Sequence, residues 1–182
     1  MLFHPGFDPV ALNLGPVQIH WYGLMYLIGF YGCWWLAVQR GKSAHMPFSA
    51  PAVSDLLFFV ALGVILGGRV GYTLFYNLPG FLADPIEIVR IWKGGMSFHG
   101  GLIGVALAVW LYAWTRKLSF FYVMDFVALV VPFGLLTGRI GNFINAELWG
   151  APSSLPWAMV FPSDPDGIPR HPSMLYEAVL EG

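Results

Sequence analysis

The chain has 182 residues, of which 57% are hydrophobic and only 10% are charged, and its formal net charge is −1. Soluble domains carry roughly 25% charged residues, so this composition excludes a disordered chain and leaves too few charges to cover an ordinary soluble surface. The near-neutral charge argues against a nucleic-acid partner, and the single cysteine, Cys33, excludes an internal disulfide and a cysteine-rich metal site. The composition therefore predicts a polytopic membrane protein.

Four apolar runs follow one another, each with the roughly 20 residues that a helix needs to cross a bilayer. We place these predicted spans at residues 17–38, 56–76, 96–114 and 118–138. Arg69 interrupts the second span, whereas Asp125 and Pro132 interrupt the fourth. A fifth span begins near Pro172 and is cut off by the end of the chain, so we expect a C-terminally truncated protein. The predicted fold class is an all-α, polytopic transmembrane helix bundle.

We expect residues 1–182 to form a single transmembrane domain with close helix packing. Several glycines recur with three residues between them, the small-xxx-small spacing of closely packed transmembrane helices. These runs are Gly63-Gly67-Gly71, Gly100-Gly104 and Gly134-Gly138.

Two connections between the predicted spans are long, residues 77–95 and 139–171. The first contains Ile86–Trp92, which suits a short helix at the membrane interface. The second contains several prolines, which exclude a continuous helix, and its uncharged part, Leu148–Ser163, suits a re-entrant or surface loop. We expect both connections to be outer-face loops with short interfacial helices.

The positive charges indicate the orientation, because short cytoplasmic loops are enriched in Lys and Arg. Clusters of both residue types follow the first and third spans, and the N-terminal segment has neither, although the raw count is equal on the two sides. We therefore predict that the N-terminus lies outside. Alternation of the spans then places most polar side chains at the outer face and Asp125 toward the inner one. The outer group comprises Tyr22, Arg69, His99, Arg139, Asn142, Glu147 and Glu177.

Two ionisable residues within the spans are candidates for function. An arginine is expensive in hydrocarbon, so Arg69 is expected to face the bundle interior or a polar cavity; the alternative is a structural pair with an acid or with backbone carbonyls. His99 is followed by two glycines, and a histidine pKa of about 6.5 suits proton transfer. The alternative is a satisfied hydrogen-bonding histidine. The other histidines show no ligand spacing with it, so we predict no metal site.

The segment Gly138–Gly150 is the densest polar stretch at membrane depth. If it is helical, Arg139 and Asn142 share a face because they are three residues apart. The guanidinium fork of Arg139 matches a pair of phosphate oxygens, whereas an interfacial cap with a snorkelling arginine is the alternative. Motifs of soluble hydrolases, metalloproteases and phosphate-binding loops are absent from the sequence. Any chemistry would therefore come from polar side chains around a lipid headgroup.

The segment Gly138–Gly150, GRIGNFINAELWG, resembles the signature of bacterial phosphatidylglycerol–prolipoprotein diacylglyceryl transferases. Further stretches agree with this family: Ile19–Tyr26, Gly67–Tyr72, Gly94–Gly104 and Arg170–Ala178. The resemblance implies a multi-pass enzyme of the bacterial inner membrane with seven spans, its N-terminus outside and its active site toward the outer face. Such an enzyme moves the diacylglyceryl group of phosphatidylglycerol, a membrane lipid, to the lipobox cysteine thiol of a preprolipoprotein peptide. The products are a thioether and glycerol phosphate; this is the first step of bacterial lipoprotein maturation, and no cofactor is needed.

The resemblance also implies which residues form the site. The residues implied to be catalytic are Tyr22, His99 and Arg139. Those implied to bind substrate are Arg139, Asn142, Glu147, Gly150, Arg69 and Gly94. Family members continue for about two further spans that contain another functional arginine, and this chain lacks that part.

The implied reaction is a displacement at an sp³ carbon, which needs a thiolate and a neutralised leaving phosphate. His99 is the candidate base, Arg139 would hold the phosphate, and Glu147 could orient Arg139 or position the glycerol hydroxyls. The alternative is a reaction driven by arginine alone, with a spontaneously ionised thiol. A non-enzymatic lipid or anion transporter would also place Arg and His at midspan, but it predicts an internal repeat and polar access from both faces.

Overall fold

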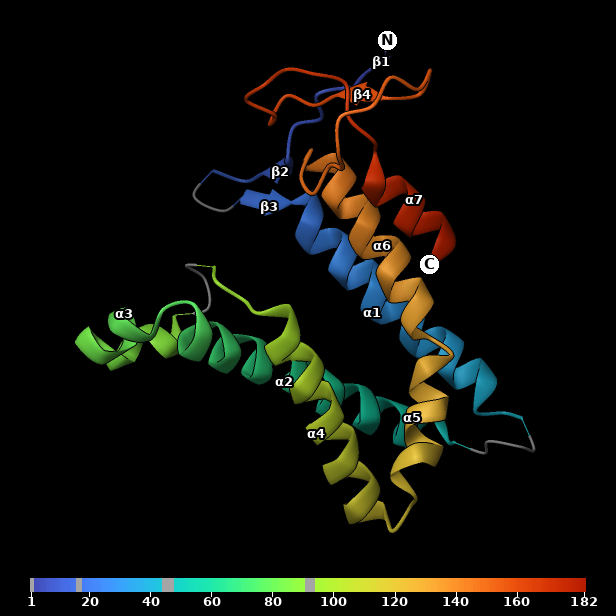
Figure 1. The fold of residues 1–182 in the computed structure, drawn as a ribbon. Helices are drawn as coiled ribbons and strands as arrows, with labels where there is room; N and C mark the ends of the chain where they lie inside the picture. Colours follow the sequence, from blue (N-terminus) through green and yellow to red (C-terminus); the bar gives the residue numbers. More distant parts are fainter. Residues whose placement is uncertain (1, 16–17, 44–47, 91–93) are drawn as a thin grey trace. The chain divides into compact units, whose positions relative to one another are not determined.

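The computed structural model describes residues 2–15, 18–43, 48–90 and 94–182. The chain is mostly helical and divides into two compact units (Figure 1). The first unit comprises residues 1–37 and 128–182, and the second unit comprises residues 38–127. The start of the predicted first span at Val17 and the end of the predicted interfacial helix at Trp92 lie outside the described residues.

Among the described helices, α2 (Ala50–Phe75) and α4 (Phe98–Arg116) are long and apolar enough to cross a membrane. The helices α5 (Phe120–Ala128) and α6 (Val131–Ile144) add a third span if the pair is counted as one broken helix. The break precedes Pro132, which has no N–H and cannot continue α5; it lies in the first turn of α6 instead. A predominantly helical membrane protein is confirmed, whereas the count of four spans stays a prediction.

The helix α1 (Trp21–Arg40) occupies most of the first predicted span. It is not among the described helices that are long and apolar enough to cross a membrane. Its sequence contains three tyrosines and three tryptophans, whose polar ring atoms make the helix less apolar. The helix begins only at Trp21 because the residues before it are extended, with β2 (Val10–Asn13) pairing antiparallel with β3 (Gln18–His20).

In the second unit, α2 packs against α4 (Figure 1), and the contact runs along glycines of both helices. A methyl group on Gly104 would collide with the carbonyl oxygen of Gly63, and one on Gly67 would collide with that of Gly100. The two backbones therefore approach directly and run antiparallel, and the small-xxx-small spacing in these two helices is confirmed as a packing seam. Where α2 begins and α4 ends, Arg116 of α4 forms an ion pair with Asp55 of α2.

The described part of the connection from α2 to α4 contains short helical segments. They are α3 (Leu78–Ala83) and the 3₁₀ turn η1 (Pro85–Val89). The Asp84 side chain begins η1 by accepting a hydrogen bond from the Ile86 amide at 3.2 Å. Whether this loop lies at the outer membrane face stays a prediction.

In the first unit, α6 packs against α7 (Ser173–Leu180) and the N-terminal residues join the segment between these helices. The strand β1 (Leu2–Phe3) pairs in parallel with β4 (Met159–Val160). His4 Nε2 donates to the carbonyl of Phe143 in the last turn of α6 at 2.7 Å. The N-terminus thus closes over the end of the helix that carries the polar segment.

The predicted fourth span ends at Gly138, but α6 continues to Ile144. The apolar residues Ile140, Phe143 and Ile144 sustain the helix through the polar segment. Arg139 therefore lies inside a helix and not in the loop after it, and it shares a face with Asn142.

The glycine seam predicts a difference between two neighbouring substitutions in α4. Gly104→Ala should lower the melting temperature of the detergent-solubilised protein by about 4 °C or more, because the methyl group overlaps the α2 backbone. Gly101→Ala is the matched control, since its nearest non-local neighbour, the Val64 carbonyl oxygen, would lie 3.8 Å away. Equal melting temperatures for the two variants would contradict the seam.

Candidate functional site

A group of polar side chains lies at the C-terminal end of α6. Arg139 Nη1 donates to Asn142 Oδ1 at 3.5 Å. Asn142, which is only 7% exposed, donates through Nδ2 to Glu147 Oε1 at 2.8 Å. Asn145 Nδ2 approaches the same Glu147 oxygen at 3.4 Å. These contacts join three predicted site residues, Arg139, Asn142 and Glu147, into one hydrogen-bonded chain.

The backbone after α6 folds Glu147 back toward the helix. Ala146 and Leu148 have φ angles of 55° and 59°, in the left-handed region that residues other than glycine rarely adopt. The Glu147 amide donates to the Asn142 carbonyl at 3.0 Å, which closes the turn. Backbone strain of this kind persists only where the surrounding structure supports it, and it often accompanies a functional site.

Tyr22 reaches this group from the first turn of α1. Its ring lies against Gly141 of α6, where an added methyl group would come within 3.1 Å of Tyr22 Cδ2. Its hydroxyl forms a hydrogen bond with the Tyr26 hydroxyl at 3.1 Å and lies close enough to Asn142 and Glu147 to interact with both. Gly141 thus lets the tyrosine approach the polar residues of α6.

The ionic partner of Arg139 is Glu177, on α7. Arg139 Nη2 and Glu177 Oε2 are 2.5 Å apart, and the two side chains are 27% and 33% exposed. Glu147, the acid expected to orient Arg139, instead reaches it through Asn142. Within the described parts of the chain, Glu177 and Asn142 are the polar side chains that contact Arg139, so several of its N–H groups remain available.

Gly150 belongs to the loop that frames this group. Its amide donates to the carbonyl of His171 at 2.9 Å, and a methyl group on Gly150 would lie 3.1 Å from His171 Cβ. The glycine therefore allows two loop segments to approach closely. No contact recorded for the described residues joins Gly150 to Arg139 or Asn142.

Arg69, in the second unit, is enclosed by backbone carbonyls. It is 5% exposed, and its Nε, Nη1 and Nη2 atoms together make five hydrogen bonds, equal to the five N–H groups of a guanidinium. The acceptors are the carbonyl oxygens of Glu87, Ile88, Arg90, Gly94 and Gly95. The structure therefore agrees with the alternative named for Arg69 in the sequence analysis, in which backbone carbonyls are its partners.

His99 lies in the first turn of α4, a few residues after Gly94 and Gly95, whose carbonyls bind Arg69. Gly94 and Gly95 precede the helix with φ angles of 78° and 81°, which favour glycine, and Ser97 caps the helix by accepting from the Gly100 amide at 3.2 Å. His99 is exposed, and within the described residues it has no recorded hydrogen-bond partner. In the same residues, no three His, Cys, Asp or Glu side chains converge to hold a metal ion.

The structure thus groups the predicted site residues into two sets. Tyr22, Arg139, Asn142 and Glu147 come together in the first unit, with Gly150 in the adjoining loop. The second set belongs to the second unit and comprises Arg69, Gly94 and His99. The prediction that both sets share one membrane face stays a prediction.

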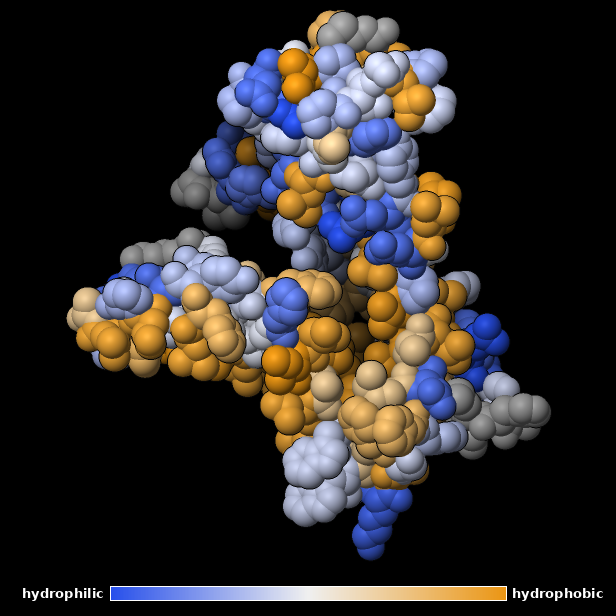
Figure 2. Space-filling view, viewed as in Figure 1, coloured by the Kyte–Doolittle hydropathy of each residue, from blue (hydrophilic) through white to orange (hydrophobic). Residues whose placement is uncertain are grey.

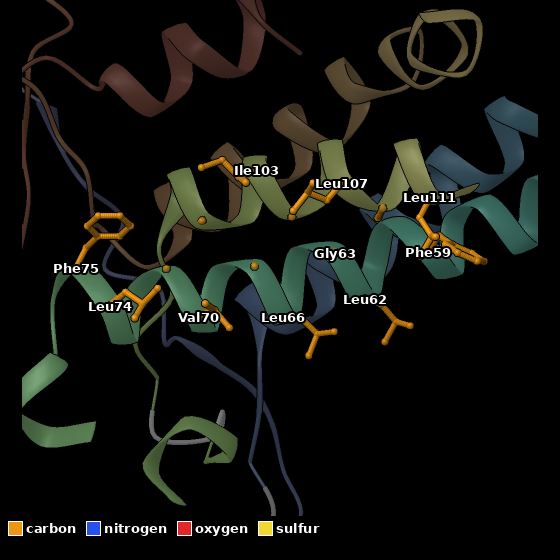
Figure 3. Close-up of a pocket in the computed structure, with 15 residues that line it drawn as sticks. Phe59, Leu62, Gly63, Leu66, Val70, Leu74, Phe75, Ile103, Leu107 and Leu111 are labelled. Atoms are coloured by element: carbon orange, nitrogen blue, oxygen red, sulfur yellow. The ribbon is translucent and has the colours of Figure 1, made fainter. Parts of the chain in front are cut away.

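A groove of about 540 Å³ follows α2 and α4 (Figure 3), but its lining carries no ionisable side chain. Its walls are glycines and large apolar residues such as Leu66 and Ile103. Apolar residues also dominate the visible surface of these helices in Figure 2. Such a groove offers no group for acid–base or phosphate chemistry, so the polar residues at the end of α6 are the better candidate for the reacting site.

The chain matches the sequence model of the family described as prolipoprotein diacylglyceryl transferase over residues 9–182. It is 60% identical to the phosphatidylglycerol–prolipoprotein diacylglyceryl transferase of Azotobacter vinelandii, and 58% identical to those of Ectopseudomonas mendocina and Methylococcus capsulatus. These alignments cover the whole chain and 69%, 68% and 70% of the three relatives, respectively. The chain belongs to the prolipoprotein diacylglyceryl transferase family. The resemblance noted in the sequence is confirmed.

A buried ion pair between Arg170 and Asp164 organises the loop between α6 and α7 in this member of the diacylglyceryl transferase family. Arg170 donates to both carboxylate oxygens of Asp164, at 2.6 and 3.1 Å, and to Asp166 at 2.6 Å. The guanidinium carbon lies 4.2 Å from the ring centre of Trp149. Arg170 and Asp164 are 8% and 6% exposed, and the hydrogen bonds from Arg170 hold the pKa of Asp164 below its usual value.

This ion pair predicts a loss of loop order in acid. Because the pKa of Asp164 is lower in the folded loop than in the unfolded chain, where it is about 3.9, the carboxylate stabilises the loop above that value. The contribution disappears as the pH falls through the lower, folded-state pKa. Hydrogen exchange at the Met159 and Arg170 amides, corrected for intrinsic rates, should therefore be faster in Asp164→Asn at pH 6, with the difference from wild type shrinking below about pH 3.5.

Asp166→Asn is the matched control, because Asp166 bonds the same arginine while its side chain is 63% exposed. It should change exchange much less than Asp164→Asn does. A difference between Asp164→Asn and wild type that stays constant from pH 6 to pH 3 would contradict the role given to the carboxylate.

Proposed function

We propose that this chain transfers the diacylglyceryl group of phosphatidylglycerol to the lipobox cysteine thiol of preprolipoproteins. The names of the relatives support the lipid donor, the prolipoprotein acceptor and the transferase activity over a non-enzymatic lipid or anion transporter. The products would be a thioether-linked lipid and glycerol phosphate, which makes this the first step of lipoprotein maturation. The chain's own residues would perform the reaction without a cofactor.

The observation that carries the proposal is the contrast between two arginines. Arg69 uses all of its N–H capacity on backbone carbonyls, whereas Arg139 is held by Glu177 and Asn142 and retains further N–H donors. A guanidinium with two free donors on one edge can bind two oxygens of a phosphate. Arg139 is therefore the residue that we assign to the phosphate of phosphatidylglycerol.

In the proposed reaction the thiolate sulfur attacks the sp³ carbon that carries the phosphate ester. The C–S bond forms as the C–O bond breaks, and the electron pair of that bond leaves with glycerol phosphate. Arg139 neutralises the charge that develops on this leaving group. His99, exposed at the start of α4, would accept the thiol proton.

The remaining site residues would bind and orient the headgroup. The Tyr22 hydroxyl and the Asn142 amide would donate hydrogen bonds to it, and Glu147 would hold Asn142 in place. Gly150 would shape the loop beside the site. Arg69 would act through Gly94, whose carbonyl it binds at 2.6 Å, to shape the approach to His99.

We place the protein in the bacterial inner membrane as a multi-pass domain with its N-terminus outside. In this proposal the described helices are part of a bundle with the four spans that the sequence predicts. The loops at 77–95 and 139–171 and the active site lie toward the outer face. The two apolar helices α2 and α4 support the membrane location, and the positive charges after the first and third predicted spans support the orientation.

The activity can be tested with membranes that carry the intact protein, radiolabelled phosphatidylglycerol and a synthetic lipobox peptide. Label should move to the peptide, and replacing the acceptor cysteine of the peptide by serine should abolish the transfer because a thiolate is the nucleophile. Absence of transfer by a folded, intact protein would contradict the proposed function.

The same transfer assay tests the role of His99 as the general base. His99→Ala should lower the transfer rate by about a hundredfold or more near neutral pH, the usual loss when a general base is removed. A near-normal rate would overturn this role and favour a reaction driven by arginine with a spontaneously ionised thiol.

A further inference from the structure

Glu177 occupies a position that makes it part of the site, although the family resemblance assigns it no role. Its carboxylate lies 2.5 Å from Arg139 Nη2. It is the one acid that contacts Arg139 among the described residues, since Glu147 bonds the amides of Asn142 and Asn145 instead. The residue proposed to bind the phosphate is therefore already paired with a carboxylate.

The position of Glu177 is determined by the contacts that anchor α7. The first residue of α7, Ser173, donates through its hydroxyl to the carbonyl of Leu148, at 2.7 Å, in the turn after α6. Met174 is completely buried and packs in the core with Ala146 and Phe161, and Ala178 is 4% exposed on the same helix. The turn that presents Glu147 thus also anchors the helix that presents Glu177.

The charge of Glu177 affects both the orientation of Arg139 and its ability to bind an anion. In the absence of substrate, Glu177 neutralises the Arg139 guanidinium and limits its rotation by holding Nη2, while Asn142 holds Nη1. A phosphate diester is also an anion, so it must share the guanidinium with the carboxylate or displace it. The same carboxylate therefore favours the correct orientation of Arg139 and opposes anion binding.

We propose that Glu177 is a positioning residue that orients Arg139 and competes with the phosphate of the lipid for it. The assignment rests on the proposed function, in which Arg139 binds the headgroup phosphate. It predicts that removing the charge of Glu177 strengthens lipid binding and slows the chemical step. A side chain that only stabilises the fold would not produce these two opposite effects.

The test is the kinetics of Glu177→Gln in the intact protein, which keeps the shape of the side chain and removes its charge. The KM for phosphatidylglycerol should fall roughly two- to fivefold, the factor expected from one partly exposed ion pair. The kcat should fall about tenfold or more, because Arg139 is no longer held in its productive orientation. Glu177→Asp keeps the competing charge on a shorter side chain, so it should lower kcat while leaving KM near the wild-type value.

Glu181→Gln is the matched control, because Glu181 follows the same helix, is exposed and has no contact with Arg139. It should leave both constants unchanged. If Glu177→Gln leaves KM unchanged or raises it, the competition is disproved. If it lowers KM without lowering kcat, the orienting role is disproved.

Equilibrium binding of phosphatidylglycerol, diluted in phosphatidylcholine nanodiscs, separates this proposal from the proposed function. Glu177→Gln should bind phosphatidylglycerol roughly two- to fivefold more tightly than wild type. Tighter binding in a protein that transfers no diacylglyceryl group would support the competition and contradict the proposed function. Binding that is unchanged or weaker would overturn the role of Glu177, whether or not the wild type is active.

Discussion

The hydrogen-bonding demand of an arginine on an apolar helix is the constraint on which both candidate regions depend. A guanidinium has five N–H groups, and each unsatisfied polar group is costly in a water-poor environment. Arg69 meets the demand with backbone carbonyls. Arg139 meets only part of it, with Glu177 and Asn142. This difference separates an arginine that organises the backbone from one that can bind a ligand.

Small residues make these arrangements possible. The glycine seam brings the α2 and α4 backbones into direct contact, Gly141 lets Tyr22 lie against α6, and Gly150 lets the loop approach His171. Gly141 and Gly150 thereby allow Tyr22 and His171 to lie close against the backbone. The abundance of glycine in this chain is therefore consistent with a polar site built between closely packed helices.

The parts of this architecture that depend on local pattern could be predicted from the sequence. Glycines with three residues between them predict the seam of α2 and α4, and the i, i+3 spacing predicts the shared face of Arg139 and Asn142. The prolines predict that residues 139–171 are not one helix. Hydropathy alone does not predict the continuation of α6 to Ile144, because the polar residues from Arg139 onward mark the end of the apolar run. The left-handed turn at Ala146 and Leu148 had no sequence signal, since neither residue is glycine or asparagine.

Contacts between distant segments could not be predicted in the same way. The alternation of spans predicts that Glu177 and Arg139 lie at the same membrane face, but their pairing depends on how α7 packs after a long, proline-containing loop. For Arg69 the sequence leaves an acid and backbone carbonyls as possible partners, and only the structure decides between them. A single sequence contains no measure of such distances, so the acid that contacts Arg139 emerged only from the structure.

In the proposed site the free N–H groups of Arg139 bind the phosphate of the lipid as a fork. The most direct test is equilibrium binding of phosphatidylglycerol to Arg139→Lys, which keeps the charge but removes the fork, with Arg116→Lys at the far end of α4 as the control. Arg139→Lys should bind about tenfold more weakly, and Arg116→Lys should bind like the wild type. Wild-type binding by Arg139→Lys would contradict phosphate binding by the guanidinium fork.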